Sequence, residues 1–187
     1  MNTEIIFVID KSGSMGHLAN DTIGGFNNFI NQQKEQDGKT ILTTILFDTT
    51  HKILHDGIDV REVAPLTSND YAPYGGTAML DAIGDIINTV QDRHDNMENE
   101  KPDKVMFVIT TDGEENSSHH FTKAQIEKMI KHQTKGHGWT FMFLGANMDA
   151  VKEAENIGIS KQYSVNYAYS SMGVAFSQIY KTIITLY

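Results

Sequence analysis

The chain contains no cysteine, which excludes disulfide bonds from whatever stabilises it. It has no apolar run approaching the roughly 20 residues that a membrane-spanning helix needs, and no charged and then apolar leader at its N-terminus. We see no linker, internal repeat or low-complexity segment in its 187 residues, and only three prolines. These absences predict one domain over residues 1–187, long enough to bury its own core, in a protein located in the cytoplasm.

An excess of basic side chains is missing as well. The 15 lysines and arginines are outnumbered by 24 aspartates and glutamates, which gives a net charge of −9. Binding to nucleic acid or to an anionic membrane needs side chains that neutralise phosphate, so we expect neither as a partner. The acidic balance is compatible with the binding of a cation.

Strand and helix patterns alternate from one end of the chain to the other. Apolar runs predict strands, and apolar residues at helical spacing predict helices between them. The expected strands span residues 5–9, 41–47, 52–58, 104–110, 139–144 and 162–165. The expected helices cover 19–36, stretches that begin at Thr77 and at Thr122, a short stretch after 147, and a terminal stretch over 172–187. This order predicts a doubly wound, Rossmann-like α/β fold, with a mostly parallel central sheet of about six strands and helices on both faces.

One pair of strands has a different connection. Residues 41–47 and 52–58 are joined by the short turn Asp48-Thr49-Thr50, which leaves no room for a crossover helix. We therefore expect an antiparallel hairpin, whose second strand lies at an edge of the sheet.

The stretch Asp10-Lys11-Ser12-Gly13-Ser14 directly follows the apolar run 5–9. That run suits a central strand buried on both faces, so Asp10 leaves the strand at its carboxyl end, where open α/β sheets bind ligands. One carboxylate and two hydroxyls form a hard oxygen set, which suits Mg²⁺, Mn²⁺ or Ca²⁺ better than zinc or copper. The alternative is an ordinary turn in which Asp10 or Ser14 caps backbone amides.

Two more oxygen side chains are expected at the same edge. Asp112 ends the second buried strand, and Thr77 follows Gly75-Gly76 at the start of a helix. Each also has a local explanation, a tight turn for Asp112 and a helix cap for Thr77. The predicted topology nevertheless sends both to the edge that carries Asp10. If the two strands are neighbours, the crevice between them is the point where the chain direction diverges and ligands bind.

These motifs resemble those of the von Willebrand factor type A domains. The resemblance spans essentially the whole chain in element order, and its motifs are Asp10-x-Ser12-x-Ser14, Thr77 within Gly-Gly-Thr, and Asp112 within Thr-Asp-Gly. It implies the family's metal-ion-dependent adhesion site. The hydroxyls of Ser12, Ser14 and Thr77 would bind one Mg²⁺ or Mn²⁺, with Ca²⁺ as an alternative, and Asp10 and Asp112 would bind directly or through water.

The resemblance also implies a function, that of a metal-ion-dependent protein-binding module which is not an enzyme. A protein partner would supply an Asp or Glu carboxylate to the cation's remaining position. A first alternative is a phosphohydrolase of haloacid dehalogenase type, with Asp10 as nucleophile, but that chemistry needs an acid/base carboxylate where this chain has Ser12. A second alternative is a structural scaffold subunit whose metal has no effect on partner binding.

Other side chains near this edge have two interpretations. Glu114 and Glu115 either strengthen the negative field around a cation or are solvated loop carboxylates. Tyr71 and Tyr74, which we expect to be exposed, either belong to a contact surface or close their loop onto the sheet. Asn147 is either a rim residue or part of an Asx turn.

Histidine pairs occur at His119-His120 and at His51 and His55, which share one face of a predicted strand. No cysteine accompanies them and no helix pairs them, so we do not expect zinc.

Overall fold

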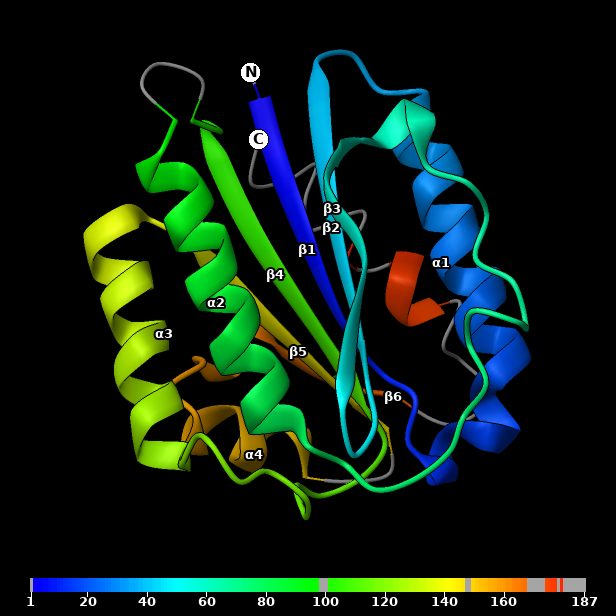
Figure 1. Cartoon of the computed structure of the whole chain (residues 1–187), viewed down its shortest axis with the longest axis vertical. Helices are drawn as coiled ribbons and strands as arrows, with labels where there is room; N and C mark the ends of the chain where they lie inside the picture. Colours follow the sequence, from blue (N-terminus) through cyan, green and yellow to red (C-terminus); the bar gives the residue numbers. More distant parts are fainter. Residues whose placement is uncertain (1, 98–100, 147–148, 168–173, 178, 180–187) are drawn as a thin grey trace.

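The computed structural model describes residues 2–97, 101–146, 149–167, 174–177 and 179. Its centre is a six-stranded sheet in the order β3-β2-β1-β4-β5-β6 (Figure 1). The strands are β1 (Asn2–Asp10), β2 (Lys39–Phe47), β3 (His51–Asp59), β4 (Lys104–Thr111), β5 (Thr140–Ala146) and β6 (Ser164–Tyr167). The α-helices are α1 (Ala19–Lys34), α2 (Met79–Asp95), α3 (Lys123–His137) and α4 (Ala150–Asn156). Three 3₁₀ turns are η1 (Gly13–Leu18), η2 (Val60–Glu62) and η3 (Lys161–Tyr163).

The strand pairing confirms the predicted fold class. β2 and β3 form the antiparallel hairpin that their short turn required, and β3 lies at the edge of the sheet. Every other neighbouring pair is parallel. Since β1 pairs with both β2 and β4, the strand order diverges at the β1–β4 boundary, the place where doubly wound sheets bind ligands.

β1 is buried on both faces because its alternate side chains enter two different cores. Ile5, Phe7 and Ile9 pack in one apolar cluster with side chains of α1. Ile6 and Val8 pack in a second cluster with side chains of α2, α3 and α4. Helices therefore cover both faces of the sheet, as Figure 1 shows for α1 on one side and α2 and α3 on the other.

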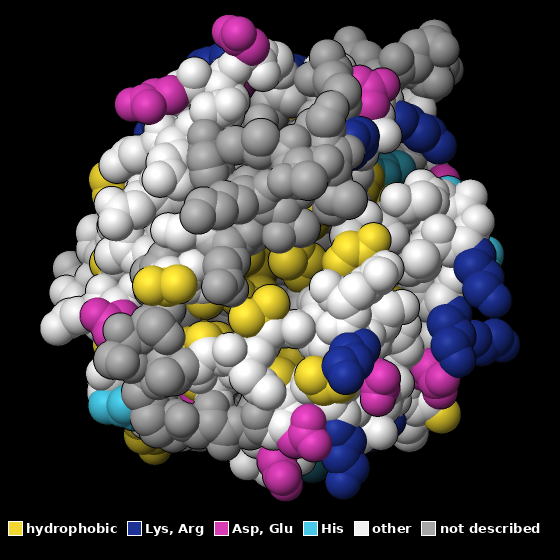
Figure 2. All heavy atoms as spheres, turned by 180° about the vertical axis from the view of Figure 1, so that it is seen from behind, with side chains coloured by type: hydrophobic (Ala, Val, Ile, Leu, Met, Phe, Trp, Pro, Cys, Tyr) yellow, Lys and Arg dark blue, Asp and Glu magenta, His cyan; other side chains and the backbone are white. Residues whose placement is uncertain are grey.

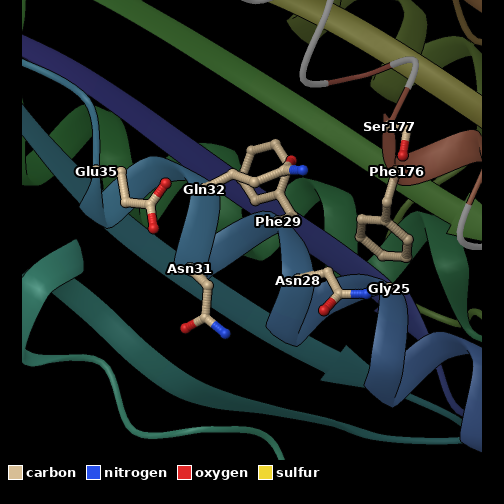
Figure 3. Close-up of a pocket in the computed structure, with 8 residues that line it drawn as sticks. All are labelled: Gly25, Asn28, Phe29, Asn31, Gln32, Glu35, Phe176 and Ser177. Carbon is tan, nitrogen blue, oxygen red and sulfur yellow. The ribbon is translucent and has the colours of Figure 1, made fainter.

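The short helical stretch 174–177 approaches α1 closely. Phe176 lies against Gly25, where an added Cβ would be 2.5 Å from the Phe176 ring (Figure 3). Only glycine at position 25 allows this approach without a shift of the ring. Of the predicted terminal helix over 172–187, residues 174–177 and 179 belong to the described part, and 174–177 are helical.

Some element boundaries differ from the prediction. The helix expected from Thr77 begins at Met79, and the helix expected over 19–36 ends at Lys34. The last strand runs over Ser164–Tyr167 and not over 162–165, because η3 occupies the residues before it. Differences of this size are usual where a helix begins or frays.

The described acidic side chains on the face seen in Figure 2 are scattered. Acidic and basic side chains both lie around the margin of that face, with apolar side chains between them. Among the described helices, none has the length and apolar character needed to cross a membrane.

Candidate metal centre

The carboxyl ends of β1 and β4 bring two aspartates to one edge of the sheet. Asp10 is the last residue of β1, and Asp112 follows Thr111, the last residue of β4. The two strands pair directly, with Ile9 opposite Thr110. The neighbouring arrangement that the sequence analysis required is therefore present, and both aspartates are buried.

Asp10 is held by two neutral donors. Its Oδ1 accepts a hydrogen bond from the Ser12 amide at 2.7 Å, and its Oδ2 accepts one from the Thr111 hydroxyl at 2.6 Å. Burial is the main influence on the acid and raises the pKa of Asp10 to about 6. The two hydrogen bonds act in the opposite direction, and the negative charge of Asp112 adds a smaller increase.

Ser12, Ser14 and Asp112 form a connected row of oxygens. The Ser14 hydroxyl donates to Asp112 Oδ1 at 2.6 Å, and the Ser12 and Ser14 hydroxyl oxygens lie 3.1 Å apart. The other carboxylate oxygen, Asp112 Oδ2, is buried and has no hydrogen-bond partner among the described residues. A buried carboxylate oxygen without a donor is costly, and a bound cation would relieve that cost.

Thr77 approaches the same place from the start of α2. A Cβ added at Gly113 would lie 3.7 Å from the Ser14 hydroxyl oxygen and 3.9 Å from that of Thr77, so both hydroxyls border the space beside Gly113. Two glycines before Thr77 allow this approach. Gly75 has a φ of +76°, and a Cβ at Gly76 would come within 2.2 Å of the Ser117 hydroxyl oxygen.

The predicted ligands are thus linked pair by pair, Asp10 to Ser12, Ser12 to Ser14 and Ser14 to Asp112, with the Thr77 hydroxyl beside Gly113, and their chemistry fits a hard divalent cation. The set contains two carboxylates and three hydroxyls, which are oxygen ligands of the kind that Mg²⁺, Mn²⁺ and Ca²⁺ accept. The nearby Lys11 does not neutralise the two aspartates, because its ammonium group is paired with Asp48. The described part of the chain contains no cluster of three or more His, Cys, Asp or Glu side chains suited to a metal, so a cation here would depend on the hydroxyls.

The two tyrosines of the long loop have different roles. Tyr74 is 80% exposed, as expected, but the expectation that Tyr71 is exposed is wrong, because only 1% of it is accessible. The Tyr71 hydroxyl donates to the backbone carbonyl of Asp10, and burial raises the pKa of Tyr71 well above its usual value. Tyr71 thus closes the loop onto the sheet, whereas Tyr74 leaves its side chain exposed while its amide donates to the Lys11 carbonyl at 2.9 Å.

Two contributors to the site were not identified from the sequence. Thr111 donates a hydrogen bond to Asp10. Its position directly before Asp112 was the sequence signal that could have indicated this role. Glu115 is neither a solvated carboxylate nor a source of negative field alone, because its Oε2 accepts a hydrogen bond from the Leu80 amide at 3.0 Å. Glu114 is exposed. Asn147 lies outside the described residues.

The histidine pairs do not converge on a common site. His51 lies 3.2 Å from the carboxylate of Asp85, and His55 Nδ1 lies 3.1 Å from the Thr44 hydroxyl. His119 and His120 donate their backbone amides to Asp81.

Comparison with known proteins supports the interpretation of the fold. A family model described as the von Willebrand factor type A domain matches residues 4–182. No curated protein matches the sequence at a significant level. Manganese-loaded TRAP protein of Plasmodium vivax is 20% identical with a TM-score of 0.67, and the match covers 94% of this chain and 71% of that one.

Two further solved structures are similar over most of this chain. The pilus adhesin SpaC of Lactobacillus rhamnosus GG is 15% identical with a TM-score of 0.74, over 97% of this chain and 30% of that one. Proximal thread matrix protein 1 of the mussel byssus, with a zinc-occupied MIDAS motif, is 14% identical with a TM-score of 0.67, over 96% of this chain and 47% of that one. The chain thus spans about half the length of the byssus protein, and at these identities the likeness concerns the fold.

Proposed function

Because the chain belongs to the von Willebrand factor type A family, we propose that it is a metal-ion-dependent protein-binding module. The proposed ligands of the cation are Asp10, Ser12, Ser14, Thr77 and Asp112. The observation that carries this proposal is the unpartnered, buried Asp112 Oδ2 beside two serine hydroxyls. The chain places charged oxygen there without a counter-charge of its own, which favours a cation from solution.

Mg²⁺ or Mn²⁺ is the proposed cation, and Ca²⁺ is an alternative with the same ligand chemistry. When bound, it would act as a Lewis acid that attracts an additional oxygen ligand, because three hydroxyls and two carboxylates fill only about five of its roughly six coordination positions. Residues of the chain itself would position these ligands. Ser12 and Ser14 orient their hydroxyls along the loop after β1, and Thr111 and the Ser12 amide hold Asp10 in place.

The proposed partner is a protein that offers an Asp or Glu carboxylate to the cation. Two of the similar structures support this proposal, since one is a pilus adhesin and the other, TRAP protein, is loaded with manganese. Tyr74 is exposed, and its amide is bonded to the Lys11 carbonyl in the loop after β1, so its ring would be available to add apolar contact area for a partner. A phosphohydrolase has less support, because both Asp10 oxygens already accept hydrogen bonds and Ser12 replaces the needed acid.

The first test is a calorimetric titration of chelator-treated protein with Mn²⁺. Wild type should bind at one site, and Asp112→Ala or Thr77→Ala should weaken binding more than about 100-fold, because loss of a ligand exceeds the usual cost of losing an outer partner. Asp85→Asn is the matched control, since it removes a carboxylate of α2 that pairs with His51 away from the site. Mn²⁺ affinity that survives in both ligand variants would refute the ligand set.

The second test addresses the partner. Peptides with a central Asp should bind the Mn²⁺-loaded protein, whereas the same peptides with Asn should not, and chelator should abolish the difference. Tyr74→Ala should weaken peptide binding about 3- to 10-fold without changing Mn²⁺ affinity, because an exposed aromatic contributes contact area to a partner only. Peptide binding that is equal with and without metal would support the scaffold alternative.

A further inference from the structure

The start of α2 lacks a cap of its own. Ala78 occupies the N-cap position, where its methyl group cannot accept a hydrogen bond, and no side chain at that position caps the helix. The first amides of a helix have no partner within the helix, and an N-cap side chain normally accepts from the second or third of them. In α2 these two amides belong to Leu80 and Asp81.

The loop after β4 caps these amides from a distant part of the chain. Glu115 Oε2 accepts from the Leu80 amide at 3.0 Å, and the Ser118 hydroxyl accepts from the Asp81 amide at 3.1 Å. Asn116 Oδ1 accepts from the amide of Thr77 at 2.9 Å, just before the helix. The cap therefore comes from the segment that begins with Asp112.

Asp81 connects α2 back to the loop after β4. Its carboxylate accepts three backbone amides of the same loop, from His119 at 2.8 Å and from His120 and Phe121 at 2.9 Å. Burial acts to raise the pKa of Asp81, but these three hydrogen bonds outweigh it, and the net pKa lies below its usual value. In a capping box, the side chain at the third helical position accepts a hydrogen bond from the backbone of the capping residue. Asp81 holds that position in α2, but the residues that cap the helix lie in a different segment of the chain.

We propose that Asp81 and Glu115 are positioning residues of the metal centre, which hold Thr77 and Asp112 at the separation that a divalent cation requires. The inference rests on the proposed function. Thr77 lies two residues before α2, and Asp112 lies three residues before Glu115, so the reciprocal caps join the two segments that carry these ligands. Loosening the caps would leave both ligands present but poorly placed.

Substitutions can break these caps with little change of shape. In Glu115→Gln, one carboxylate oxygen becomes an amide nitrogen, so the side chain can no longer accept both from Leu80 and from the Ser118 amide. In Asp81→Asn, a nitrogen likewise faces a backbone amide that needs an acceptor. Ser118→Ala removes the acceptor for the Asp81 amide without any change of charge, which separates geometry from electrostatics.

Mn²⁺ titration of the full chain tests the proposal. Asp81→Asn, Glu115→Gln and Ser118→Ala should each weaken Mn²⁺ binding about 10-fold, in the range found for residues that orient metal ligands. Asp85→Asn is the charge control on the same helix. Asp149→Asn is the cap control, because Asp149 caps the Lys152 amide at the start of α4, and both controls should leave Mn²⁺ affinity within about twofold of wild type.

Hydrogen exchange of the metal-free variants gives a second measurement. The amides of Leu80 and of residues 119–121 should exchange faster in Asp81→Asn than in wild type, while those of α4 should not change. Wild-type Mn²⁺ affinity in folded Asp81→Asn and Ser118→Ala, with loss in Thr77→Ala, would overturn this inference alone. Failure of wild type to bind Mn²⁺ would overturn the proposed function and this inference with it.

Discussion

β1 buries a carboxylate near each of its ends, and the two have different surroundings. Glu4, near the amino end, is 1% exposed and accepts hydrogen bonds from the Arg93 guanidinium, from His94 Nε2 at 2.7 Å and from the Thr43 hydroxyl at 3.1 Å. The guanidinium is a permanent cation, so the chain supplies the counter-charge for Glu4 itself.

Asp10, at the carboxyl end, is 0% exposed and accepts hydrogen bonds from neutral groups, the Ser12 amide and the Thr111 hydroxyl. Its pKa is raised to about 6, mainly by burial, and one oxygen of the neighbouring Asp112 has no partner among the residues that the structure describes. An unpaired buried charge is unfavourable, and a fold can retain it when a ligand provides the missing charge. The amino end of β1 thus has a counter-charge within the chain, whereas the carboxyl end is where we propose that a cation binds.

The largest expected effect on stability comes from removing the Glu4 carboxylate near the amino end of β1. Glu4→Ala removes the acceptor of buried His94 and one of the two carboxylate partners of half-buried Arg93, which should lower the free energy of unfolding by about 3 kcal/mol. Urea unfolding monitored by circular dichroism measures this loss. Mn²⁺ affinity of the folded fraction should stay at the wild-type value.

Glu4→Gln is the conservative control for that experiment, because it keeps the volume and one acceptor oxygen. It should destabilise less than Glu4→Ala. Asp112→Ala gives the opposite profile, with lost Mn²⁺ affinity and little change in metal-free stability. If Glu4→Ala reduced Mn²⁺ affinity as strongly as stability, the two ends of β1 would not have separate roles.

The features that were predictable depend on residues close together in the sequence. The apolar run of β1 fixes its burial on both faces, and the short turn after β2 fixes the hairpin. The helix expected from Thr122 begins at Lys123, where Thr122 and Gln125, three residues apart, form a local capping box. The ends of the apolar runs likewise predicted that Asp10 and Asp112 leave neighbouring strands at one edge of the sheet.

The features that were missed depend on contacts between distant residues. Glu4 and Arg93 are 89 residues apart, and Glu115 and Leu80 are 35 apart, so no local pattern pairs them. α2 begins at Met79 and not at Thr77, because its cap comes from another segment. Burial of Tyr71 follows from its hydrogen bond to the Asp10 carbonyl, 61 residues away. Such contacts are set by tertiary packing, which periodicity does not describe.

A smaller effect on stability should appear when Mn²⁺ is added. At 100 times its dissociation constant, Mn²⁺ should stabilise wild type by about 2.7 kcal/mol, because it binds the folded state and not the unfolded one. Glu4→Gln should gain the same amount, and Asp112→Ala should gain none. Urea unfolding with Mn²⁺ or with chelator measures the difference, and an equal gain in Asp112→Ala would place the stabilising cation elsewhere.

The smallest expected effect is the pH dependence of stability that Asp10 contributes. In metal-free protein the pKa of Asp10 rises from 3.8 unfolded to about 6 folded, so the folded state binds the proton more tightly. Stability from this group is therefore fully present below about pH 4 and is lost as pH rises through about 6, at a cost of about 3 kcal/mol at pH 7. Asp10→Asn removes the charge but also one acceptor, so the net gain at pH 7 should be about 2 kcal/mol.

Urea unfolding of wild type and Asp10→Asn in chelator, between about pH 4 and pH 7, isolates this contribution because other titrating groups cancel in the difference. The variant should be more stable at pH 7, and its advantage should disappear as pH falls to about 4, where Asp10 of folded wild type is protonated. Saturating Mn²⁺ at pH 7 should reverse the order, since only wild type binds it. If Asp10→Asn were the less stable protein at pH 7 in chelator, the buried charge would already be satisfied by the chain, and the contrast with Glu4 would fail.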